Sequence, residues 1–112
     1  MQMSPHLKLL RVLQEHPQAL ETHFHYAACI KAIESEFDKV RISFESNLAT
    51  ELSYLVFDLE VMNGLALCDW ELDGRPQVWC LWQQDYLADA FDLLKQFKQI
   101  LNGEQLHYIR HV

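Results

Sequence analysis

The sequence predicts an α+β fold in which an N-terminal helical hairpin precedes a ferredoxin-like β-α-β-β-α-β domain. Three observations support this prediction: two helical segments bounded by prolines, an alternating apolar run at 39–46, and a predicted β-hairpin at Leu65–Trp82. A chain of 112 residues favours a single domain spanning 1–112. The helical hairpin is expected in 1–37, and the sheet with its packing helices in 38–112.

The first two elements are predicted as helices that meet near Pro17. Ser4 and Pro5 are typical of a helix start, because serine caps free N–H groups and proline fits the first helical position. A residue that precedes a proline is disfavoured in a helix, so the first helix is expected to end near Glu15. The second is expected to run from Pro17 to about Phe37, after a very short connection.

A strand is expected next, at 39–46. Val40, Ile42 and Phe44 alternate with polar residues in this run. Because successive side chains of a strand point to opposite faces, the three apolar residues would share one face.

The segment Asn47–Gly64 fits two structures, and the first of them is a helix. Its apolar residues form one stripe about 120° wide, with a polar cap before it and an Asn-Gly pair at its end. Tyr54, Phe57 and Val61 lie off this stripe. The helix is favoured because the caps and the stripe agree.

The second structure for this segment is a strand. Leu55, Phe57, Leu59 and Val61 alternate with polar partners, and Asn63-Gly64 would make a tight hairpin turn. With this choice the fold becomes two helices, a four-stranded antiparallel meander and a C-terminal helix.

The predicted β-hairpin pairs Leu65–Leu72 with Gln77–Trp82. The residues between them, Asp-Gly-Arg-Pro, are typical of a turn, because proline cannot donate to a β-ladder. Trp79 and Trp82 are three residues apart and therefore point to opposite faces of a strand. At least one of them is expected to be exposed, unless the N-terminal helices cover the second face and bury both.

The last elements are a helix and a strand. Asp85–Leu101 carries an apolar stripe at helical spacing that includes Phe91, with acidic residues near its start and Lys95 and Lys98 near its end. An Asn-Gly pair would close this helix. The final residues, 104–112, alternate in the manner of a strand.

Charge is distributed unevenly along the chain. The formal net charge is −7, which argues against direct binding of nucleic acid, because the phosphate backbone is also negative. Between Ile42 and Leu94 the sequence contains one basic residue, Arg75. The same stretch contains ten acids: Glu45, Glu51, Asp58, Glu60, Asp69, Glu71, Asp73, Asp85, Asp89 and Asp92.

These acids indicate either a solvated face or a surface for a basic partner. Aromatic side chains surrounded by acids are typical of a binding hot spot, which favours the outward face of the predicted hairpin. The residues predicted to bind the partner are Asp58, Glu60, Asp69, Trp70, Glu71, Asp73, Trp79 and Trp82.

We therefore expect a small acidic protein-binding protein, acting as an inhibitor, immunity factor or phage-encoded antagonist on a nuclease, toxin or nucleic-acid-binding protein. The alternative is a regulatory or small-ligand-binding module that forms homodimers. The sequence lacks a glycine-rich phosphate loop and other catalytic motifs, so an enzyme is not expected, nor is a cofactor. A cytoplasmic protein is expected, because the apolar runs are too short to span a membrane and no secretory signal is evident.

Cysteines and histidines suggest three further sites, none of which is favoured. His25 precedes Cys29 by one helical turn, but a thiol on an apolar helix is more often part of the core. His107 and His111 would lie about 13 Å apart along a strand, too far to share a metal ion. A disulfide between Cys68 and Cys80, whose strands would face each other, is disfavoured in the cytosol.

Overall fold

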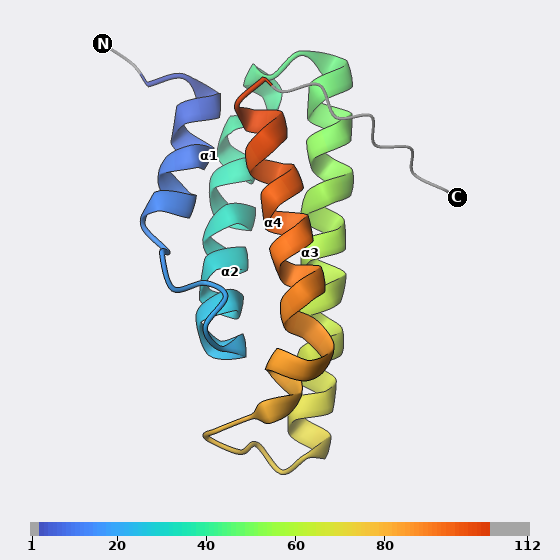
Figure 1. Cartoon of the computed structure of the whole chain (residues 1–112). Coiled ribbons are helices and arrows are strands. Elements are labelled where there is room, and N and C mark those ends of the chain that lie inside the picture. Colours follow the sequence, from blue (N-terminus) through green and yellow to red (C-terminus); the bar gives the residue numbers. More distant parts are fainter. Residues whose placement is uncertain (1–2, 104–112) are drawn as a thin grey trace.

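The computed structural model describes residues 3–103 as four α-helices packed side by side (Figure 1). The helices are α1 (Pro5–Gln14), α2 (His23–Val40), α3 (Ser46–Leu72) and α4 (Leu87–Leu101), with a 3₁₀ turn, η1 (Arg41–Ser43), before α3 and a π-helical turn, η2 (Trp82–Tyr86), before α4. Residues 3–103 contain no strand. The α+β prediction, the ferredoxin-like sheet and the alternative four-stranded meander are therefore all wrong.

The helices alternate in direction, so that α1 and α3 run one way and α2 and α4 the other (Figure 1). α1 packs against α2 and α4, and α3 packs against the same two helices. Each helix contributes fully buried side chains, such as Leu9 in α1, Ile33 in α2, Leu59 in α3 and Phe97 in α4. Every helix thus buries an apolar stripe in one shared core, as is usual for helices that pack together. In the described chain, 3–103, no helix is both long and apolar enough to cross a membrane.

The N-terminal pair of helices is close to the prediction, but its connection is longer. α1 begins as expected, with the Leu7 N–H donating to Ser4 Oγ at 3.2 Å. α2 begins at His23 rather than at Pro17, because Thr22 is its cap and accepts from the His25 N–H at 3.1 Å. The residues between the helices form turns instead of a helix.

The strand predicted at 39–46 is wrong. α2 continues to Val40, and η1 follows it directly. Val40 and Phe44 are buried, but Ile42 between them is 93% exposed. A tight helical turn rotates neighbouring side chains away from one another, so three apolar residues at alternate positions do not share a face here.

For 47–64 the helix alternative is confirmed, but the helix continues through Gly64. The start of α3 is capped by Glu45, whose carboxylate accepts from the Asn47 and Leu48 N–H groups at 2.9 and 3.1 Å. Gly64 lies within the helix, where an added Cβ would meet nothing within 4 Å. An exposed helical glycine costs about 1 kcal/mol relative to alanine, too little to end a long amphipathic helix.

The predicted β-hairpin at Leu65–Trp82 is also wrong, although its turn is real. The first expected strand forms the last two turns of α3. Gly74 ends the helix with a φ of 87°, and the Arg75 N–H donates to Trp70 O at 3.0 Å. This geometry is a Schellman cap, in which glycine accepts the left-handed conformation that other residues avoid. In place of the second expected strand, residues 77–79 are irregular and residues 80–82 are already helical and lead into η2.

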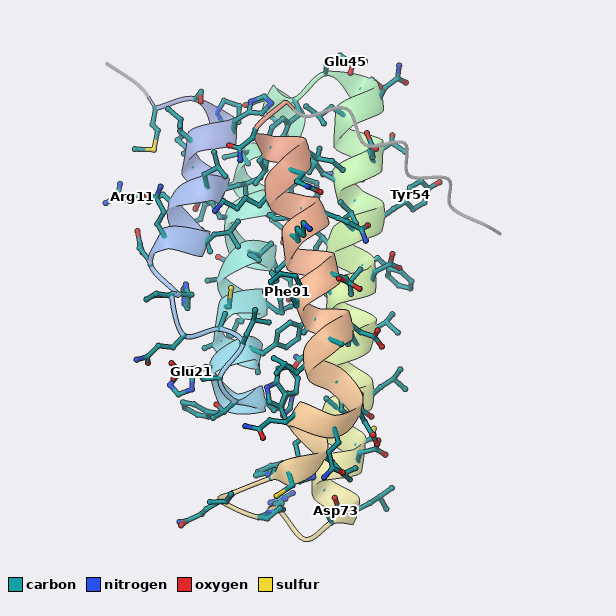
Figure 2. The ribbon with its side chains drawn as sticks, in the orientation of Figure 1. Arg11, Glu21, Glu45, Tyr54, Asp73 and Phe91 are labelled. Atoms are coloured by element: carbon teal, nitrogen blue, oxygen red, sulfur yellow. The ribbon has the colours of Figure 1, made fainter. Side chains whose placement is uncertain are left out.

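The C-terminal helix is largely confirmed. α4 ends at the expected Asn-Gly pair, and Gly103 has the left-handed φ of 78°. Phe91 differs from the prediction, because it is half exposed and lies at the front of α4 (Figure 2) instead of in the core. The strand predicted at 104–112, and with it His107 and His111, lies outside the described residues.

Candidate functional site

A groove of about 610 Å³ lies at the end of the molecule that contains the loop between α3 and α4. We call it the Trp groove, because all three tryptophans line it. Its walls come from the start of α2, the last turns of α3 and the loop at 73–81. Most of the lining is apolar: Phe24, Ala27, Leu67, Trp70, Pro76, Val78, Trp79 and Trp82.

The three indole N–H groups hold this end of the fold together. Trp70 Nε1 donates to Pro76 O at 2.9 Å, and Trp79 Nε1 donates to the Asp73 carboxylate at 2.7 Å. Trp82 Nε1 donates to Leu20 O at 3.0 Å and so ties η2 to the connection between α1 and α2. The three indole donors are therefore already used, and the partly exposed rings of Trp70 and Trp79 line the groove.

Four aromatic rings, three of which line the Trp groove, cluster where α2 meets η2. The His23 ring lies 5.8 Å from the Trp79 ring and 5.7 Å from the Trp82 ring. His23 Nε2 donates to Asn63 Oδ1 at 2.8 Å, which links the start of α2 to α3. Tyr86 stacks on Trp82 with 6.3 Å between centroids. Trp82 itself is 1% exposed, so it belongs to the core and not to an open binding face.

Tyr86 connects η2 to α3 through Asp69. Its hydroxyl donates a short hydrogen bond to the Asp69 carboxylate. This hydrogen bond, together with burial and the negative charge of Asp69, raises the pKa of Tyr86 to about 12. Asp69 is thus already hydrogen-bonded within the protein, where it links α3 to the π-helical turn.

Two other acids of the predicted binding surface also have internal partners. Glu71 forms an ion pair with Arg75 at 3.0 Å, on the exposed surface. Asp73 accepts from Trp79 and follows the last residue of α3. The structure brings these two and Asp69 together at one end of the molecule, where Asp73 is labelled in Figure 2.

Asp58 and Glu60 lie near the middle of α3, on the N-terminal side of the turns that line the Trp groove. Glu60 faces Glu34 of α2. The pKa of Glu34 is raised by burial first, then by the negative charges of Glu60 and Asp38. The eight predicted residues therefore do not form one surface. Six gather around the Trp groove and the end of α3, and two lie in the middle of the helix.

A second, acidic groove of about 440 Å³ lies between α3 and α4. Val61 and Leu65 of α3 form one side, and Asp89 and Asp92 of α4 form the other. Asp58 also lines it. We call it the α3–α4 groove.

Asp89 and Asp92 belong to the acidic stretch of the sequence but are not among the residues predicted to bind the partner. Their spacing of three places both on one face of α4, as does the step of four from Asp92 to Gln96. Gln96 lines the same groove, and its Oε1 atom is buried without a hydrogen-bond donor among residues 3–103.

The cysteines do not form the sites that the sequence raised as alternatives. Cys29 is fully buried, as expected for a core thiol, and burial raises its pKa to about 11, which disfavours a reactive thiolate. His25 Nδ1 is 2.7 Å from Thr22 Oγ1. Cys68 and Cys80 are free and exposed, one on α3 and one beside η2.

Within 3–103, no group of three or more His, Cys, Asp or Glu side chains is arranged to hold a metal ion. The same residues offer two surfaces suited to binding, namely the apolar Trp groove and the acidic α3–α4 groove. No protein-family model matches the chain, and no curated protein and no solved structure matches it either.

Proposed function

We propose that this chain is a non-catalytic protein that binds a basic partner protein through the acidic side formed by α3 and α4. The partner is a nuclease, a toxin or another nucleic-acid-binding protein, whose basic surface the chain would occupy as an inhibitor, immunity factor or antagonist. Surfaces that bind nucleic acid are rich in Lys and Arg, and an acidic protein competes for them. The proposed setting is the cytoplasm, which suits a protein with free thiols.

The α3–α4 groove carries this proposal. It places the carboxylates of Asp89 and Asp92 on α4 opposite Val61 and Leu65 of α3. Within residues 3–103, neither Asp89 nor Asp92 has an ion-pair partner. A Lys or Arg side chain from a partner would supply the positive charge that these two carboxylates lack.

The expected result of neutralising this groove is a loss of binding without a loss of folding. The protein and its Asp89→Asn/Asp92→Asn variant are immobilised, and basic proteins from the host are captured, identified and purified. The dissociation constant of each captured protein is then measured at about 50 mM and about 500 mM salt, between which screening increases several-fold. We expect the variant to bind about tenfold more weakly, and the higher salt to weaken the original protein similarly.

The matched control is the Glu15→Gln/Glu36→Gln variant, which has the same change in net charge. These acids line a small hollow beside α1, and neither of them lines the α3–α4 groove. If both variants bind the purified proteins equally, or if binding is indifferent to salt, the proposal is wrong.

A second candidate function is the binding of a small ligand in the Trp groove. Its volume of about 610 Å³ is within the usual range for small-molecule sites, and its lining is mostly apolar. Because the indole donors are used internally, the ligand would be neutral and apolar or aromatic.

Nile red, a neutral dye whose emission increases in apolar sites, is the probe for this second function. We expect saturable binding that is lost in a Phe24→Lys/Val78→Lys variant, since both side chains are exposed and line the groove. A Leu72→Lys variant, changed at an exposed residue outside the groove, serves as the control and should still bind the dye. Unsaturable binding, or equal binding by all three proteins, would exclude a defined site.

A further inference from the structure

α3 has a second apolar face, opposite the one that it buries in the core. Phe57, Val61, Leu65, Cys68 and Leu72 follow one another at steps of four, four, three and four residues. We call these residues the outer face of α3. They lie on one side of the helix over about 22 Å. All five are exposed, including Phe57 at 57% and Leu65 at 58%.

The core face of α3 accounts for a different set of residues. Leu55, Leu59, Met62 and Ala66 are among those that pack against α2 and α4. Side chains also project from α3 away from the bundle, as Tyr54 does in Figure 2. A helix that is apolar on two sides exposes more apolar surface than solubility favours, and a contiguous exposed patch typically marks an interaction site.

Carboxylates lie along both edges of the outer face. On the side of α2, Glu60 lies near Glu34, whose pKa is raised first by burial and then by the charges of Glu60 and Asp38, while Lys31 lowers it. On the side of α4, Asp89 and Asp92 face Val61 and Leu65 across the α3–α4 groove. We call these two groups the acidic margins. A partner that covers the outer face therefore meets negative charge on either side.

An apolar helical face can bind a second copy of the chain, a lipid surface or a helix of another protein, and the charge pattern distinguishes among these partners. A second copy of the chain would place carboxylates against carboxylates in either orientation of the two helices, because both margins are acidic, and like charges in contact are unfavourable. An anionic lipid surface is disfavoured for the same reason. An amphipathic helix with Lys or Arg on both sides of its apolar stripe matches the apolar face and the margins at once.

We propose that the outer face of α3 binds an amphipathic helix of the partner protein, with the apolar residues of that helix along the outer face and its Lys or Arg side chains over the acidic margins. This inference rests on the proposed function and specifies the partner's chemistry. The two helices would lie side by side along α3, with apolar contacts providing affinity and the margins providing selectivity.

Three synthetic peptides of about 20 residues test this inference, since that length supports several helical turns. The first has a leucine stripe at helical spacing with Lys on both sides, the second replaces each Lys with Glu, and the third scrambles the first. Binding to the full chain is measured by isothermal titration calorimetry. We expect the first peptide to bind at least about tenfold more tightly than the other two.

Two variants identify the surface that the peptide contacts. Phe57→Ser/Leu65→Ser removes apolar side chains from the outer face, and Ile42→Ser removes an exposed one from η1 as the control. Circular dichroism verifies that each variant is folded. We expect the first variant to weaken binding of the Lys peptide at least about tenfold, and the control to leave it unchanged.

Each contrary outcome has a separate meaning. If the scrambled peptide binds as well as the helical one, or if Phe57→Ser/Leu65→Ser retains full affinity, helix docking on the outer face is wrong while a basic partner remains supported. If the chain is a dimer in solution and this variant makes it a monomer, a second copy occupies the face and the inference is wrong. If neither basic peptide binds and no basic protein is captured, the proposed function itself fails.

Discussion

Replacing Trp82 with alanine is expected to lower the free energy of unfolding by about 3–5 kcal/mol, the usual cost of removing a large buried aromatic side chain. Trp82 is among the largest fully buried side chains, and it contacts three other aromatic rings: His23, Tyr26 and Tyr86. Its indole N–H also bonds to Leu20 O, so the change breaks a tie between η2 and the connection from α1 to α2. Urea unfolding followed by circular dichroism measures the effect.

Two further variants make this result specific. Trp82→Phe keeps a ring but removes the donor, so it should cost less, about 1–3 kcal/mol. Val78→Ala, at an exposed position of the same loop, should change the free energy of unfolding by less than about 0.5 kcal/mol. If Trp82→Ala costs no more than Val78→Ala, Trp82 does not lie in the core.

The second large expected effect is a difference in unfolding free energy between substitutions on the two apolar faces of α3. Leu59→Ala is expected to lower the free energy of unfolding by about 2–5 kcal/mol, because it leaves a cavity in the core. Leu65→Ala, an identical chemical change less than two turns away, is expected to cost less than about 0.5 kcal/mol, because Leu65 is 58% exposed. Thermal and urea unfolding of the two variants provide the comparison. Equal costs would mean that α3 buries a different face from the one described.

Local signals in the sequence predicted the helices that have one apolar stripe. The start of α1 depends on Ser4 and Pro5, and the end of α4 on its Asn-Gly pair; both were predicted correctly. These features act within a few residues, through capping hydrogen bonds and the conformational freedom of glycine. They need no information about the rest of the chain.

The predicted hairpin failed because each of its two strands contains a continuous apolar run, at 65–68 and 78–82. Leu65 and Leu67 suit one face of a strand, and Ala66 and Cys68 suit the other, so the period of two was accepted. The same residues also suit a helix that buries Ala66 and exposes Leu65. Period alone does not separate these structures when apolar residues occupy both faces. Tyr54, Phe57 and Val61 were a usable signal, since they did not fit the main stripe of the predicted helix and are exposed on α3.

Charge and composition predicted only part of the candidate site. The tryptophans were correctly associated with one region, and they line one groove. Folding decides which acids have partners: Asp69 accepts from Tyr86 across to η2, while Glu71 and Asp73 pair with Arg75 and Trp79 nearby in the chain. The α3–α4 groove was missed because it depends on two helices that are adjacent only after folding. Whether the predicted residues bind a partner stays a prediction.

The sequence by itself determined the strongly acidic stretch between Ile42 and Leu94, the helix ends at Ser4 and Gly103, and the apolar content that a core requires. Only the tertiary structure decided that 47–72 is one helix, which of its two apolar faces is buried, and which carboxylates lie beside the other. The physical reason is that capping and net charge are set by neighbouring residues in the chain. Burial depends instead on which helices pack together, and α2 and α4 together cover only one side of α3 in the described structure.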